Sequence, residues 1–179
     1  LVMSGTFMFS GFPEAPYLQG RSLDPVPEAT MPARVWHRRL PSFRSRRPLA
    51  NHLHEGDLPD GLDLGAVVAV DSEAMGLNLN RDDLCVVQLS AGDGDAHVVR
   101  LNRPAYDCPK LKKLLGDPQV LKIFHYGRFD IGMISRYLGV TTAPVYCTKI
   151  ASRLVRTYTD RHGLKDLTKE LLGIDISKA

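Results

Sequence analysis

The stretch VVAVDSEAMGL, residues 67–77, decides the fold of this chain. Its first four residues are apolar and mostly β-branched, which predicts a strand over residues 66–73 that is buried on both faces. Asp71 and Glu73 follow one residue apart, and because strand side chains alternate, both carboxylates project to the same face. Two like charges repel there, so the pair is either a set of metal ligands or two solvated acids in a turn after the strand.

A second stretch, VLKIFHYGRFDIGMI at residues 120–134, predicts another apolar strand followed by a helix. Asp130 enters this helix, and an acid in a first helical turn is favoured by the helix dipole, so alone it is a weak signal. Neighbouring strands of one sheet could bring Asp130 beside Asp71 and Glu73. Oxygen-only ligands favour Mg²⁺ or Mn²⁺, and two such ions about 3.5–4 Å apart support phosphodiester cleavage.

The rest of the pattern becomes regular from about residue 53. Further strands are predicted at 84–90, 96–102, 119–126 and 143–148. Helices are predicted at 108–117, 128–140, 148–158 and 162–173. This order of elements predicts an α/β fold with a mixed five-stranded sheet and helices on both faces.

The amino-terminal part has a different composition. Residues 1–60 hold eight of the twelve prolines and seven arginines but no lysine. Proline at this density opposes both helix and strand, so residues 1–52 are predicted to be a disordered or non-native extension. An RNA-binding arm is the alternative interpretation of its arginines.

Cysteine content and hydropathy argue against a disulfide-rich, a zinc-binding and a membrane-spanning protein, while the net charge is less decisive. The chain has 179 residues and a net charge of +3, which tolerates a polyanionic partner without requiring one. Cys85, Cys108 and Cys147 have neither zinc-ligand spacing nor an even count, which favours reduced thiols in a cytoplasmic protein. No apolar run approaches the roughly 18–20 residues of a membrane span.

Two interpretations of the basic residues near the carboxyl end stay open: a phosphate-binding track, or the ordinary polar faces of two helices. These residues are Lys149, Arg153, Arg156, Arg161, Lys165 and Lys169.

Taken together, VDSEAMGL at residues 70–77 and FHYGRFD at residues 124–130 resemble the first two motifs of ribonuclease D and the wider DEDD family of 3′–5′ exonucleases. The segment YTDRHGLKDLTKELLGIDISKA, residues 158–179, resembles the segment that precedes the third motif. The resemblance covers about residues 53–179 and implies an RNase H-like fold. It also implies an exoribonuclease that hydrolyses single-stranded RNA from its 3′ end and releases nucleoside 5′-monophosphates.

The resemblance implies a role for each acid of the two motifs. Asp71 and Glu73 would ligate the Mg²⁺ or Mn²⁺ ion that activates the attacking water. Asp71 and Asp130 would hold the second ion near the leaving 3′ oxygen. These three residues are therefore the expected metal ligands and catalytic residues.

Five more residues are expected to bind substrate by the same resemblance. Leu77 would pack against the terminal base, and the backbone around Ala74 and Met75 would receive the 3′-hydroxyl. Arg128 and Phe129 precede the aspartate as a cation and an aromatic residue do in relatives. Arg128 is either a phosphate contact or a surface arginine of the helix.

The family's third motif, written Y-x-x-x-D in the ribonuclease D branch, does not occur in the sequence. The tyrosines after the second motif, Tyr137, Tyr146 and Tyr158, are each followed four residues later by a residue other than Asp. The domain at residues 53–179 is therefore expected to be incomplete at its carboxyl end. Two alternatives stay open: a nucleic-acid-binding domain of the same fold without catalysis, and a proofreading exonuclease domain of the DNA-polymerase type.

Overall fold

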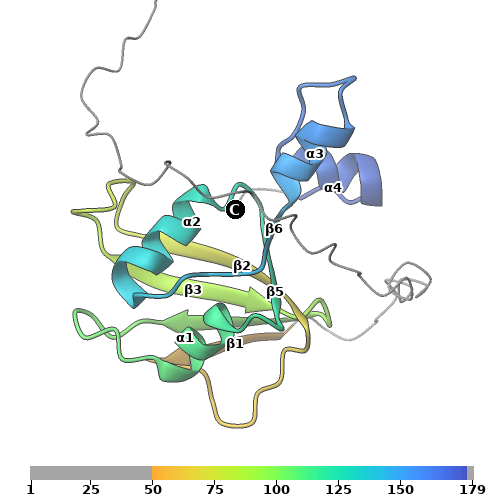
Figure 1. Cartoon of the computed structure of the whole chain (residues 1–179). Helices are drawn as coiled ribbons and strands as arrows, with labels where there is room; N and C mark the ends of the chain where they lie inside the picture. The colour runs from red at the N-terminus through yellow and green to blue at the C-terminus, as the bar shows by residue number, and fades with distance from the viewer. Residues whose placement is uncertain (1–49, 177–179) are drawn as a thin grey trace, which may run out of the picture. The chain divides into compact units, whose positions relative to one another are not determined.

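A computed structural model of the chain describes residues 50–176. They form one six-stranded mixed sheet with the strand order β1-β4-β3-β2-β5-β6 (Figure 1). The strands are β1 (Ala50–Glu55), β2 (Val67–Ala74), β3 (Leu84–Ser90), β4 (Asp95–Arg100), β5 (Leu121–Phe124) and β6 (Val145–Cys147). The helical elements are α1 (Pro109–Gly116), α2 (Arg128–Met133), η2 (Ile134–Leu138), α3 (Thr148–Val155) and α4 (Leu164–Leu172).

The middle of the sheet is an antiparallel meander, because β3 pairs with both β2 and β4 in antiparallel register. The outer pairs are parallel: β5 lies beside β2, β6 beside β5 and β1 beside β4. A parallel pair needs a crossover connection, and α2 with η2 supplies the one between β5 and β6. The α/β prediction is confirmed, and the predicted strands and helices all form, with shifted ends.

The prediction of five strands is wrong, because β1 adds a sixth at the edge of the sheet. Its sequence ANHLHE is largely polar, and most of its side chains are exposed, so it carries no hydrophobic periodicity. Pairing with β4, with His52 opposite His97, makes it a strand. The predicted domain boundary at residue 53 falls inside β1, and the predicted extension lies largely outside the described residues.

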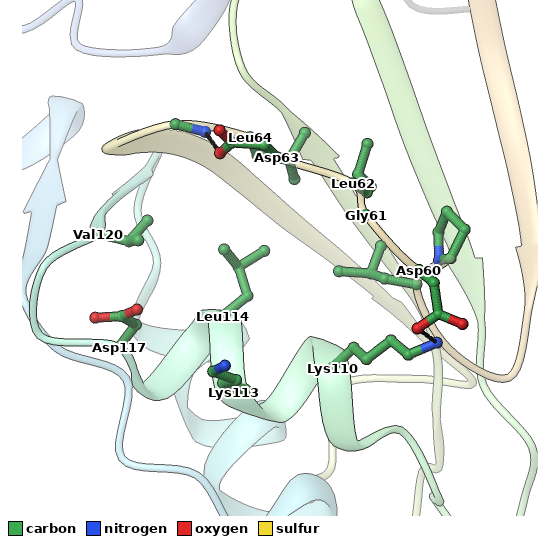
Figure 2. A pocket seen from close by; sticks show the side chains of 13 residues that line it. Asp60, Gly61, Leu62, Asp63, Leu64, Lys110, Lys113, Leu114, Asp117 and Val120 are labelled. Carbon is green, nitrogen blue, oxygen red and sulfur yellow. Dashed lines mark hydrogen bonds and ion pairs between the residues drawn. The ribbon is translucent and has the colours of Figure 1, made fainter.

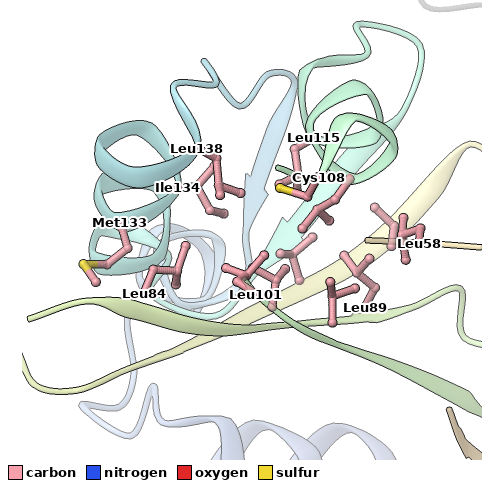
Figure 3. Close-up of a cluster of buried hydrophobic side chains, with 14 of the residues drawn as sticks. Leu58, Leu84, Leu89, Leu101, Cys108, Leu115, Met133, Ile134 and Leu138 are labelled. Carbon is pink, nitrogen blue, oxygen red and sulfur yellow. The ribbon is translucent and has the colours of Figure 1, made fainter. Parts of the chain in front are cut away.

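One face of the sheet holds the hydrophobic core. Val68, Val87 and Val99 from three neighbouring strands are fully buried beneath the helices. Leu115 of α1 and Met133 at the end of α2 belong to the same cluster and lie on the helices that cover this face (Figure 3). The long helix predicted at residues 128–140 is present as α2 followed by the π-helical turn η2.

The prediction that β2 is buried on both faces is wrong. Its side chains alternate between buried and exposed, and Val67 on the outward face is 45% exposed. The reason is that the side chains of Val67 and Ala69 lie on the outward face, so the run VVAV supplies two rather than four core residues. At this face the start of α4 contributes Leu164 to a cavity shared with Ala69.

Lys122 lies inside β5 and is completely buried. Its ammonium group donates hydrogen bonds to the carbonyl oxygens of Asp117 (2.7 Å), Val120 (2.8 Å) and Ala143 (2.7 Å). Burial lowers the pKa of Lys122, since the charged form loses its water. The three bonds fasten the start of β5 to the segment before β6.

Among residues 50–176, no helix combines the length and apolar character needed to cross a bilayer.

Candidate active site

The carboxyl ends of β2 and β5 lie at the same edge of the sheet, because these strands are parallel and pair Ala69 with Ile123. Asp71 and Glu73 are both exposed on the outward face of β2. Asp130 is the third residue of α2, which begins shortly after β5 ends. The topology therefore gathers the three acids from two motifs at one edge.

Ser72 connects the two motifs. It lies between Asp71 and Glu73 in sequence, so its side chain points to the opposite face of β2, where α2 packs. Asp130 Oδ1 accepts two hydrogen bonds from it, one from the backbone N–H (3.0 Å) and one from the hydroxyl (2.6 Å). Ser72 and Asp130 are each 8% exposed. A buried carboxylate with two such donors is fixed in orientation.

The three acids interact electrostatically. The pKa of Asp71 is raised, first by burial, then by the negative charge of Asp130 and then by that of Glu73. The backbone N–H of Ser72 opposes this shift only in part. The two neighbouring negative charges make ionisation of Asp71 more costly, and a cation would neutralise this field.

The donor chemistry of these side chains fits a hard divalent cation, since all are carboxylate oxygens. Asp130 Oδ1 already accepts the two bonds from Ser72. Within residues 50–176, no three His, Cys, Asp or Glu side chains converge closely enough to hold a metal ion by themselves. The structure thus brings the predicted ligands into one electrostatic cluster without forming a closed metal site.

A compact loop follows β2 and is built around Asp82. The Asp82 carboxylate is almost buried, accepts the N–H of Asn78 (2.9 Å) and pairs with the Arg81 guanidinium (2.6 Å). A Cβ atom at Gly76 would lie 2.2 Å from Asp82 Oδ2, so any larger residue here would displace that carboxylate. The loop holds Leu77 outward, with its side chain 85% exposed.

The loop and the bulge before it contain three of the predicted substrate-binding residues. Leu77 is exposed on the loop that follows Glu73 and Ala74. Ala74 is half-buried, at a register irregularity with Glu73. The backbone N–H of Met75 already donates to the carbonyl of Asp83 (3.0 Å), so it continues the sheet in this structure.

The other two predicted substrate-binding residues open α2. Arg128 is the first residue of the helix and its side chain is exposed. Phe129 is half-buried and packs against the hydrophobic core. Arg128 is therefore available to a phosphate group, whereas the Phe129 ring supports the position of α2.

A cavity of about 440 Å³ lies on the outward face of the sheet next to Asp71. His125 and Thr148 also line it, and His125 Nδ1 lies 2.9 Å from the hydroxyl of Thr148. The pKa of His125 is lowered, mainly by burial and further by the positive charge of Lys149. A neutral imidazole beside Asp71 is thereby favoured.

A larger cavity of about 560 Å³ lies between α1 and the segment before β2 (Figure 2). Lys110 of α1 pairs there with Asp60 (2.9 Å). Val120 and Gly65, which precede β5 and β2, also line it, so it sits at the opposite end of these strands from the acids. It is separate from the candidate active site.

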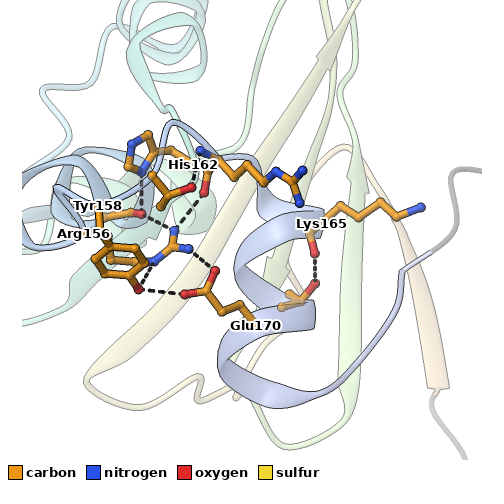
Figure 4. Close-up of polar contacts among 9 residues, drawn as sticks. Arg156, Tyr158, His162, Lys165 and Glu170 are labelled. Atoms are coloured by element: carbon orange, nitrogen blue, oxygen red, sulfur yellow. Dashed lines mark hydrogen bonds and ion pairs between the residues drawn. The ribbon is translucent and has the colours of Figure 1, made fainter.

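The predicted phosphate track over α3 and α4 is only partly available. Arg156 is buried and donates to the hydroxyl of Ser152 (2.9 Å) and the carbonyl of Arg161 (2.8 Å), and it pairs with Glu170 (Figure 4). Lys165 and Lys169 both pair with Asp175. Arg156 is thus a structural residue, because its donors bind within the fold.

Comparison with known proteins adds a family to this geometry. A family model described as 3′-5′ exonuclease matches residues 56–179. The chain belongs to the 3′-5′ exonuclease family. Curated relatives in this family include the ribonuclease D of Gluconacetobacter diazotrophicus, 34% identical over 112 residues that cover 63% of this chain and 28% of the relative. The ribonuclease D of Acidiphilium cryptum is 34% identical over 122 residues, covering 68% and 31%.

Solved 3′-5′ exonuclease-like structures agree with the fold. NrnC of Brucella melitensis with bound Mg²⁺ is 48% identical, with a TM-score of 0.69 over 73% of this chain and 65% of that one. NrnC bound to pGG is 48% identical with a TM-score of 0.70. Escherichia coli RNase D, at 22% identity and a TM-score of 0.51, shares the fold. The RNase H-like prediction is confirmed, and the chain spans less than a third of the curated relatives.

Proposed function

We propose that the protein is a 3′–5′ exoribonuclease. It hydrolyses the terminal phosphodiester of single-stranded RNA and releases nucleoside 5′-monophosphates. The observation that supports this most is the pair of bonds from Ser72 to Asp130, which ties the acid of the second motif to the residue that separates the two acids of the first in sequence. Membership of the 3′-5′ exonuclease family supports the same reaction.

RNA is the proposed substrate rather than DNA. The curated relatives are named ribonuclease D, which favours RNA. A solved relative at 48% identity is bound to pGG, which supports a nucleotide substrate of either kind. The 3′ end would enter beside Leu77, whose exposed side chain can pack against the terminal base. Arg128 stands at the start of α2, where an exposed guanidinium can bind a phosphate oxygen.

Asp71, Glu73 and Asp130 would hold divalent cations, and a relative with bound Mg²⁺ supports this assignment. Such ions lower the pKa of bound water and stabilise the charge on the leaving oxygen. The residues of the chain keep the site in place: Ser72 fixes the orientation of Asp130, and the outward face of β2 leaves Asp71 and Glu73 open to substrate.

A nucleic-acid-binding domain without catalysis is the second candidate. It is favoured by one observation: the described residues contain no closed set of three metal-ligating side chains. Under this alternative the acids would weaken RNA binding through repulsion of phosphates. Neutralising Asp71 would then tighten binding, whereas an exonuclease would lose its activity.

The test is release of a 3′-terminal labelled nucleotide from single-stranded RNA in Mg²⁺, in Mn²⁺ and in EDTA. We expect nucleoside 5′-monophosphate with either metal and none in EDTA. Asp71→Asn should abolish release, while the control Asp60→Asn, in the cavity at the other end of the strands, should not. Binding of the RNA with no release in any metal would replace this proposal with the second candidate.

A further inference from the structure

Tyr126 has an unusual backbone conformation at the turn between β5 and α2. Its φ angle is 64°, in the left-handed region that bulky residues rarely adopt. The turn is held by two bonds, from the Tyr126 N–H to Cys147 Sγ (3.3 Å) and from the Arg128 N–H to the Tyr126 carbonyl (2.8 Å). Backbone strain of this kind clusters at active sites and ligand-binding sites.

The Tyr126 ring is presented to solvent and is accompanied by a cation. The residue is 55% exposed, although a tyrosine ring gains free energy when it is buried. Lys149 Nζ, from the first turn of α3, lies 4.0 Å from the ring centroid. This cation–π contact places the ammonium group over one face of the ring. We call these two residues the Tyr126–Lys149 pair.

The Tyr126–Lys149 pair lies at the same edge of the sheet as the acids. Tyr126 is four residues before Asp130, and its neighbour His125 lines the cavity that also contains Asp71. Thr148, which precedes Lys149, lines the same cavity, so Lys149 also lies close to it. A strand bound at the acids would therefore pass beside the exposed ring.

We propose that the Tyr126–Lys149 pair is a nucleotide subsite, in which the Tyr126 ring stacks on one base of the bound single strand and Lys149 contacts a phosphate of that strand. The inference rests on the proposed function, because the strand has to be held at Asp71 and Asp130. Stacking on an aromatic ring tolerates any base, since every base has a π-face. The subsite thus supplies affinity for single strands without selecting a sequence.

Three substitutions at Tyr126 separate stacking from backbone strain. Phe keeps a ring, Leu removes it under the same strain, and Asn removes it while tolerating the left-handed backbone. Fluorescence anisotropy in Ca²⁺, a cation that carboxylate sites also bind, gives the Kd of a labelled single-stranded RNA, and hydrolysis in Mg²⁺ gives KM and kcat. We expect Tyr126→Leu and Tyr126→Asn to raise Kd and KM about 10-fold, as loss of base stacking does elsewhere, with a smaller change in kcat.

Matched variants complete the experiment. Tyr126→Phe should stay within about 2-fold of the parent Kd, because the ring rather than the hydroxyl stacks. Tyr146→Leu is the control, since Tyr146 is also exposed but lies on β6. Lys149→Gln should raise Kd less than loss of the ring and reduce the salt dependence of binding by about one phosphate contact.

Parent-like affinity in both Tyr126→Leu and Tyr126→Asn would overturn the subsite and leave the exonuclease proposal standing. An equal loss in Tyr126→Phe would also overturn it, because the ring would then not be the binding element. If the parent neither binds nor hydrolyses the RNA, the proposed function fails and the subsite fails with it. A loss confined to the two ringless variants supports the subsite.

Discussion

Ser72 is a single residue that connects the two sequence motifs. The acids on either side of it face outward, while its own hydroxyl reaches inward to Asp130, 58 positions along the chain. Because side chains alternate along a strand, a residue between two outward-facing acids faces inward. Any small hydroxyl residue between two strand acids could serve the same purpose.

Ser72→Ala should therefore affect both stability and activity. The variant loses the hydroxyl bond to a buried carboxylate, which costs about 2 kcal/mol, and only the backbone N–H of residue 72 still orients Asp130. Urea denaturation and the rate of nucleotide release measure the two effects. Ser90→Ala is the control, because it removes only neutral bonds, one donated to the Asp95 carbonyl (2.8 Å) and one accepted from the exposed Gly92 N–H (3.2 Å), and should cost only about 1 kcal/mol. Equal losses in the two variants would contradict the role given to Ser72.

Asp71→Asn should raise the melting temperature of the metal-free protein. The substitution removes a charge that Asp130 and Glu73 repel, as the raised pKa of Asp71 indicates. The same variant should lose most of the stabilisation that Mg²⁺ gives the parent, because a ligand is missing. Thermal melts with Mg²⁺ and with EDTA test both statements. An undiminished Mg²⁺ effect would show that Asp71 is not a metal ligand.

Sequence patterns predict some of these residues and not others. Asp71, Glu73 and Asp130 follow from strand alternation and from the two motifs. Ser72 and Tyr126 could not be singled out in this way, because one acts through a partner far away in sequence and the other through its backbone angle. The burial of Arg156 could not be predicted from the sequence either, because a charged residue on an amphipathic helix is ordinarily solvated.

At the scale of elements, the loop after β2 depends on close approach of its backbone to Asp82. Gly76→Ala would drive a methyl group into the Asp82 carboxylate, since the added Cβ lies 2.2 Å from Oδ2. We expect a lower melting temperature and faster proteolysis of this loop, together with weaker binding of RNA at Leu77. Gly116→Ala is the matched control, because its Cβ would only touch Val140 at an ordinary 3.5 Å. Similar melting temperatures for the two variants would contradict this account.

The same loop should respond to pH. The pKa of Asp82 lies below its ordinary value of 3.8, first because Arg81 donates to it and then because the Asn78 N–H does. A depressed pKa stabilises the fold above that ordinary value and ceases to do so as the pH falls through the folded-state value. The difference in melting temperature between the parent and Asp82→Asn should therefore be full at pH 7 and shrink below about pH 4. A difference that grows with acidity would contradict this assignment.

Elements differ in how far their sequence reveals them. The central strands carry period-two or continuous apolar patterns and are predicted well. β1 has no such pattern and forms through pairing with β4, so tertiary contact outweighs local propensity there. β5 was predicted although Lys122 interrupts its apolar run. The burial of Lys122 was not predicted, because no local pattern encodes the backbone carbonyls that bind the lysine.

At the scale of the whole molecule, stability should come mainly from one side of the sheet. Leu111 and Leu115 of α1 are fully buried, whereas Leu154 of α3 is 74% exposed. Leu111→Ala should cost about 2–5 kcal/mol of unfolding free energy, and Leu154→Ala should change it by less than about 0.5 kcal/mol. Guanidinium denaturation of both variants measures the contrast. A comparable cost at the two positions would place part of the core on α3.

Acylation of Lys122 can report when the junction around β5 opens. Every other lysine within residues 50–176 is exposed or half-buried, while Lys122 is sealed at the junction of β5 with its flanking segments. An acylating reagent will modify the accessible amines within the first exposure and reach this one only when the junction separates. The rate at which acyl-Lys122 appears in peptide mass spectra therefore measures how often this junction opens, without any engineered probe.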